Sequence, residues 1–155
     1  MKRRTIFLAG ILLAMVAQGQ AAAGARSDGA MVAGSGAGVF PAGTTFSGLT
    51  LSALQFGQGV LTDGGSTSGV FHAVLIGRSV LGRAQQITVE GKVEGGLLDG
   101  NPSFNGFAKV DMGFGDLPLV DVPFSVTVSS QNLQLTLAGT SLPAAVLSAG
   151  AIAIE

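Results

Sequence analysis

His72 is the only histidine in the chain, so any histidine-dependent catalysis must use it. It stands in the middle of the apolar segment 69–77, where a packed or interface histidine is expected rather than a general base. No Gly-x-Ser-x-Gly segment supplies an activated serine. With one histidine and no cysteine, a zinc site or another nitrogen- or sulfur-ligated metal site is hard to build. We therefore predict no catalytic residue.

Acidic residues offer a second route to chemistry. Asp111, Asp116 and Asp121 recur at five-residue spacing, and carboxylate oxygens on loops are the ligands that calcium prefers. Aspartate is also common in turns, because its side chain accepts hydrogen bonds from the nearby backbone. The spacing fits neither the helical calcium loop nor a glycine-rich calcium repeat. We therefore predict no metal site, and these three aspartates remain as the calcium candidates.

Bound cofactors and nucleic acids are not expected. The glycine-rich segments 34–38 and 113–115 match neither the dinucleotide-binding fingerprint nor a phosphate-binding loop. The net charge is −1, and no basic cluster provides the electrostatic footprint of a nucleic-acid-binding protein.

The phenylalanines are the side chains that point to binding. The chain has nine of them but no tryptophan or tyrosine, which are the usual stacking platforms for sugars. Most are expected in the core. Phe71 and Phe107 fall on strand faces that leave them outside a simple core, where an exposed apolar patch would mark a partner or a lipid-like ligand. Together with His72 and Val74, they are the candidate interface or ligand residues.

The clearest element that must position these residues is a hairpin within 116–138. Apolar residues at 124, 126 and 128 alternate with hydroxyl residues, and leucines at 133, 135 and 137 alternate with polar residues after a polar corner at 130–132. Because successive side chains of a strand point to opposite faces, both arms predict antiparallel strands with one wet face.

Other strands are predicted at 44–56, 69–77, 86–94, 104–114 and 151–155. A helical turn at 51–56 is the alternative to a strand there, because short apolar runs are ambiguous. The segment 69–77 is apolar on both faces, which predicts that a second layer or a partner covers each face.

The first residues resemble an export signal. Lys2, Arg3 and Arg4 are followed by an apolar run at 6–16 and by three alanines at 21–23. We predict a signal-peptide helix at 1–23, a flexible Gly/Ala-rich lead at 24–38 in which a short strand at 30–33 is the alternative, and one all-β domain at 39–155. No later stretch is long enough to predict a membrane span.

The expected fold is therefore a single antiparallel β-sandwich or small β-barrel of about seven or eight strands. The expected protein is a bacterial-type, secreted or periplasmic β-domain that acts without catalysis as a structural or binding module at the cell exterior, with an unidentified protein or surface polymer as partner. Association into oligomers stays open. The alternative is a small barrel that carries an apolar ligand, and a hydrolase with an unrecognised site comes third.

Overall fold

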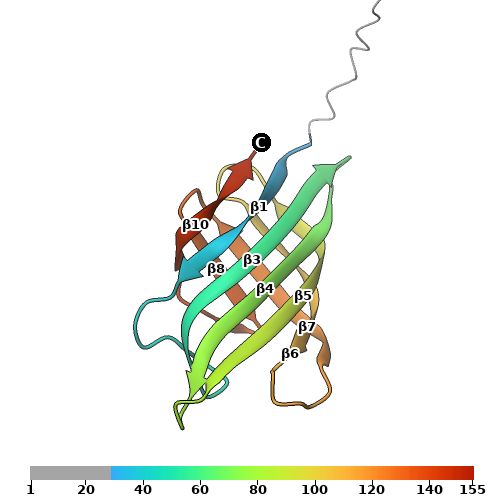
Figure 1. Cartoon of the computed structure of the whole chain (residues 1–155). Coiled ribbons are helices and arrows are strands. Elements are labelled where there is room, and N and C mark those ends of the chain that lie inside the picture. Colours follow the sequence, from blue (N-terminus) through green and yellow to red (C-terminus); the bar gives the residue numbers. More distant parts are fainter. Residues whose placement is uncertain (1–28) are drawn as a thin grey trace, which may run out of the picture.

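A computed structural model describes residues 29–155, which form ten β-strands (Figure 1). The strands are β1 (Met31–Val39), β2 (Thr45–Phe46), β3 (Leu49–Asp63), β4 (Ser66–Ser79), β5 (Ala84–Leu97), β6 (Ser103–Asp111), β7 (Leu119–Val128), β8 (Asn132–Leu137), β9 (Thr140–Ser141) and β10 (Ala145–Ile154). No helix within these residues is long and apolar enough to cross a membrane. The predicted signal at 1–23 lies outside the described residues.

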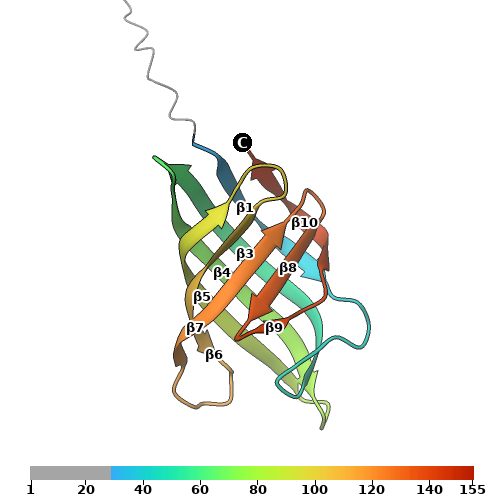
Figure 2. The ribbon, with the colours of Figure 1, turned by 180° about the vertical axis from the view of Figure 1, so that it is seen from behind.

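The strands make one antiparallel sheet that closes on itself. β3 to β8 pair in chain order, β10 pairs with β8, and β1 pairs with both β10 and β3, so that eight strands complete a ring (Figures 1 and 2). The short strands β2 and β9 lie off the ring, on β3 and β8. The predicted all-β antiparallel architecture is confirmed, with ten strands rather than seven or eight.

Every second side chain of the long strands points into the ring, and these inward side chains form the core. The hairpin predicted within 116–138 is β7 and β8. From Phe124 onward its apolar positions are buried and its hydroxyl and amide positions face outward. The predicted strand at 44–56 is confirmed as part of β2 and β3, and the helical alternative at 51–56 is wrong. The long β3 and β4 are joined by Gly64 and Gly65, which adopt the positive φ angles that a two-residue hairpin turn requires.

Three phenylalanines occupy the centre of the core. Phe71 stacks on Phe124 with 5.6 Å between ring centroids, and it meets Phe104 at 6.0 Å. Gly91 makes room for this group, because a Cβ atom there would lie 2.7 Å from the Phe124 ring. Large aromatic side chains from β4, β6 and β7 thus fill this part of the interior.

The flexible lead predicted at 24–38 is wrong for residues 31–38, which belong to β1. This strand runs between β3 and β10 and completes the ring. Its inward positions after Val32 are Gly34, Gly36 and Gly38. The strand therefore lacks the alternation of large apolar and polar residues by which strands are predicted from sequence. The small residues are required by close contact, since a Cβ atom at Gly34 would lie 2.4 Å from the carbonyl oxygen of Ala151. Residues 24–28 lie outside the described part.

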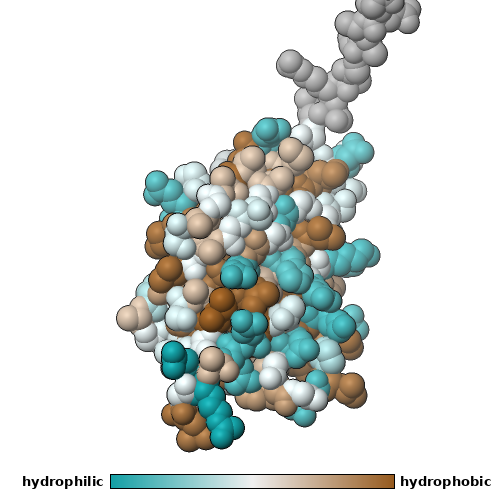
Figure 3. Space-filling view, in the orientation of Figure 1, coloured by the Kyte–Doolittle hydropathy of each residue, from teal (hydrophilic) through white to brown (hydrophobic). Residues whose placement is uncertain are grey.

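Of the two covers predicted for the faces of 69–77, a second layer is absent from the outer face within the described residues, and a partner there stays a prediction. The inward face of β4, with Phe71, Ala73 and Leu75, is buried. The outward face is not, because the sheet forms a single layer and Val70 keeps 64% of its surface exposed. The surface in Figure 3 accordingly shows apolar colour over the middle of the visible face, where β3 and β4 run.

Candidate binding surface

The outward face of β4 forms an apolar strip. It consists of Val70, His72, Val74 and Ile76, and we call it the β4 strip. Val70 and His72 are exposed, whereas Val74 and Ile76 are half-buried. Across the sheet these residues face Lys92, Glu90, Thr88 and Gln86 of β5, in that order. Three aliphatic side chains and one histidine therefore lie beside a line of polar and charged ones.

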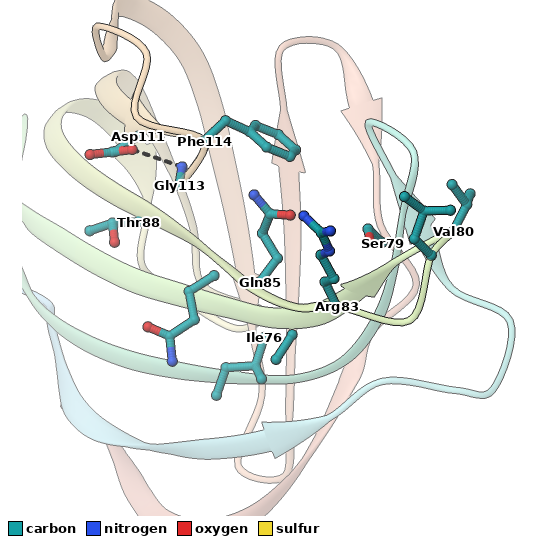
Figure 4. A pocket seen from close by; sticks show the side chains of 12 residues that line it. Ile76, Ser79, Val80, Arg83, Gln85, Thr88, Asp111, Gly113 and Phe114 are labelled. Atoms are coloured by element: carbon teal, nitrogen blue, oxygen red, sulfur yellow. Dashed lines mark hydrogen bonds between the residues drawn. The ribbon is translucent and has the colours of Figure 1, made fainter.

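The strip ends in an open groove of about 810 Å³, which we call the end groove (Figure 4). Ile76, Thr88 and Asp111 contribute to its floor, on β4, β5 and β6. Its walls are the β4–β5 turn and the loop after β6, which lie at the end of the ring opposite the C-terminus (Figure 1). Apolar side chains on these walls are open to solvent: Val80 is 91% exposed, Leu81 79% and Phe114 56%.

The turn that forms one wall is closed by its own hydrogen bonds. The amide of Ser79 donates to the carbonyl of Arg83 at 2.9 Å, and the amide of Gly82 donates back to the carbonyl of Ser79 at 2.8 Å. The guanidinium of Arg78 also donates to the carbonyl of Gly82 at 3.3 Å. Val80 and Leu81 are therefore presented from a defined turn.

The opposite wall is tied to β5. The Gln85 side-chain amide donates to the carbonyl of Met112 at 3.3 Å, and the amide of Gly113 donates to Oδ1 of Asp111 at 2.8 Å. Gly113 has a φ of 74°, and a Cβ atom there would lie 2.3 Å from the carbonyl oxygen of Gln86. Glycine is thus required for the loop to approach β5 and hold Phe114 beside the groove.

The groove is lined by both apolar and polar side chains. Arg83 and Asp111 are the charged residues that line it, and Gln85, Gln86 and Thr88 add uncharged hydrogen-bonding groups. Such a mixture suits a chain segment with apolar side chains and a polar backbone, in the way that ligand sites combine apolar contact with a few placed polar groups.

The four predicted interface residues are separated by the fold. His72 and Val74 lie on the β4 strip. Phe107 is 50% exposed on β6, in the same cross-strand row as Val70 and Lys92. Phe71 is only 1% exposed and lies in the core. Its assignment to an exposed surface is wrong, because inward parity on β4 belongs to the odd-numbered residues.

The three aspartates kept as calcium candidates do not form a cluster with one another. Asp111 lines the end groove and accepts the Gly113 bond, Asp116 is in the loop beyond, and Asp121 is on β7. Within residues 29–155, no three His, Cys, Asp or Glu side chains come close enough together to hold a metal ion. The cross-strand neighbours of His72 are Gly57 and Glu90, neither of which is a hydroxyl or thiol nucleophile.

Sequence reasoning missed the side chains on the walls of the end groove. Val80 and Leu81 fall in the segment 78–83, which reads as a connection, and Phe114 continues an apolar face of the strand before it. The available signal was an adjacent apolar pair inside a predicted loop and between two arginines. That pattern is unusual for a solvated turn and favours a contact surface.

The comparisons with known proteins give no relative to reason from: no protein-family model, no curated protein and no solved structure matches this chain.

Proposed function

We propose that this chain is a non-enzymatic β-domain, secreted or periplasmic, that binds another protein at the cell exterior through the β4 strip and the end groove. The observation that carries the proposal is the exposure of Val80, Leu81 and Phe114 around one groove. Exposed apolar side chains that gather in one place mark interaction sites on soluble proteins. A surface polymer is the other partner class that the site must be tested against.

The partner would lie along the strip with its end in the groove. Ile76 belongs to both surfaces, since it follows Val74 on the outward face of β4 and also lines the groove. A bound segment would therefore meet a continuous apolar path and find polar groups at Thr88 and Gln86 beside it. Buried aromatic and aliphatic anchors in a polar rim are the usual basis of protein recognition.

This proposal is testable with peptides selected from a random phage-displayed library against the folded protein. We expect the selected peptides to bind the end groove, so that Ile76→Glu weakens their binding at least about tenfold. The reason is that the introduced carboxylate would lose its hydration when the peptide covers it. The dissociation constant is measured by isothermal titration calorimetry.

Val39→Glu is the matched control. Val39 is also an aliphatic strand residue and is 50% exposed, but it lies on β1 and not on β4. Peptide affinity should be unchanged by this variant. If the selected peptides bind both variants as tightly as they bind the unmodified protein, the assigned surface is contradicted. If the library yields no groove-dependent peptide but a cell-wall polysaccharide binds the protein, the partner is a polymer instead.

A second candidate function, a small barrel that carries an apolar ligand, is favoured by one observation inside the ring. Gln58 on β3 is 8% exposed, and neither its Nε2 nor its Oε1 has a hydrogen-bond partner among the described residues. It lies opposite Gly34 of β1 and Phe71 of β4. A buried amide of this kind would give a polar anchor to a ligand held by the ring.

Replacing Gln58 by leucine separates the two functions. If the interior is only a core, Gln58→Leu should raise the free energy of unfolding by about 1–3 kcal/mol, because a buried unpaired amide costs about that much. Urea denaturation measures the change, and binding of the apolar probe N-phenyl-1-naphthylamine is followed in parallel. Lower stability together with loss of probe binding would instead support the carrier.

A further inference from the structure

Strand β10 is paired along one edge only for most of its length. On one side it follows β1 from Val39 to Val32. On the other it pairs with β8 through Ala145 and Val146, and the amide of Leu147 donates to the carbonyl of Gln131 at 2.8 Å. Beyond this point β10 extends past the β7–β8 turn (Figure 2). Residues 148–154 therefore have a free edge among the described strands.

The hydrogen-bond pattern shows which backbone groups that edge presents. Met31 and Glu155 exchange both backbone bonds, at 2.7 and 2.9 Å. Because bonded residues alternate along an antiparallel pair, Ala153 and Ala151 direct their backbone groups to β1. Ile154, Ile152 and Gly150 consequently direct their N–H and C=O groups away from β1, toward the free edge.

This edge lacks charges and prolines, two of the devices that normally prevent strand addition. Its irregularities are the register shift that leaves Ser148 unpaired against β1 and Gly150, whose φ is 87°. β10 contains no charged residue and no proline, although inward charges, edge lysines and prolines are the usual protection. The two strands off the ring, β2 and β9, are only two residues long, which gives an added strand little to pair with. Gly150, Ala151 and Ala153 are exposed, so the edge is open to an incoming strand.

We propose that a second copy of this chain adds its own β10 to this edge, antiparallel and about a two-fold axis at Ile152. Ile152 then pairs with its counterpart, and Gly150 pairs with Ile154 in both directions. These are the residues whose backbone groups point outward, so each pair can exchange both of its hydrogen bonds. The register is thus self-complementary, as a two-fold interface requires.

The side chains fit the same register. Ala151 of one copy lies opposite Ala153 of the other, so small uncharged residues meet on the outer face. The second copy's Glu155 lies opposite Ala149, beside the hollow of about 410 Å³ that Ser130 and Gln131 line with residues 146–150. Polar groups are therefore available where the carboxylate arrives. This inference concerns a different surface from the proposed binding site and does not depend on it.

Paired charges on the outer face test both the interface and its register. Ala151→Lys with Ala153→Lys places lysines opposite one another at two symmetric positions, and like charges directly opposite destabilise a strand pair. We expect the unmodified protein to dimerise in sedimentation equilibrium, and the double-lysine variant to dimerise at least about tenfold more weakly. Ala151→Lys with Ala153→Glu creates two opposite-charge pairs instead and should restore the dimer.

Ala33→Lys with Ser35→Lys is the control, since these residues face outward on β1 and lie beside the interface rather than in it. This variant should dimerise like the unmodified protein. An unmodified protein that stays monomeric at millimolar concentration overturns the proposal. A double-lysine variant that dimerises normally also overturns it, because the contact would then lie elsewhere. A lysine–glutamate variant that stays as monomeric as the double-lysine variant overturns the proposed register. Circular dichroism confirms that each variant is folded.

Discussion

Phe71→Ala should lower the free energy of unfolding by about 3–5 kcal/mol, the usual cost of removing a buried aromatic side chain. Phe71 is 1% exposed, and its ring contacts Phe124 and Phe104 at the centre of the ring. The loss combines the transfer of the side chain from the core with the cavity that remains, because strands fixed by their hydrogen bonds cannot collapse onto the space. Urea denaturation followed by far-UV circular dichroism measures the change.

Phe107→Ala provides the matched comparison, because Phe107 is the same residue type on the outward face and is 50% exposed. We expect this change to cost less than about 1 kcal/mol, as for most substitutions away from the core. Similar losses for both variants, or a larger loss at Phe107, would show that the inward and outward faces of β4 and β6 have been assigned incorrectly.

Val32→Asp should cost about 3–5 kcal/mol, the loss expected when a charge is buried without a partner. Val32 is fully buried on β1, between Val60 of β3 and Ile154 of β10. An aspartate there must either lose its hydration or pull β1 away from both neighbours, and each outcome opens the ring. Thermal unfolding at neutral pH provides the measurement.

Ser35→Asp is the control on the same strand. Ser35 faces outward and is exposed, so an added carboxylate should change the stability by less than about 0.5 kcal/mol. If residues 31–38 were a flexible lead, neither substitution would matter. Equal and small effects at both positions would therefore contradict the closure of the ring through β1.

Much of the strand pattern was predictable because alternation survives wherever large apolar residues occupy the inward positions. The β7–β8 hairpin, with its buried Phe124, Val126 and Leu135, is the clearest example. β1 was not predictable in the same way, because its inward Gly34, Gly36 and Gly38 give no signal. Glycine is selected there by the close approach of β10, which is a property of the assembled sheet.

The candidate site was predictable only in part, for a related reason. His72 and Val74 were found because their segment is apolar on both faces. The groove walls were not, because Val80 and Phe114 line one groove only through the placement of the β4–β5 turn and the loop after β6 at the same end of the ring (Figure 4). Phe71 was misassigned because its strand is apolar on both faces, so parity alone does not say which face turns inward.

The most direct test of the central claim, that the β4 strip and end groove form the binding surface, is the change in backbone amide chemical shifts of the ¹⁵N-labelled protein when a selected peptide is added. We expect the largest changes at Ile76, in the turn at 79–83 and at 112–114. Largest changes on β8, β10 or the inward-facing residues would contradict that claim.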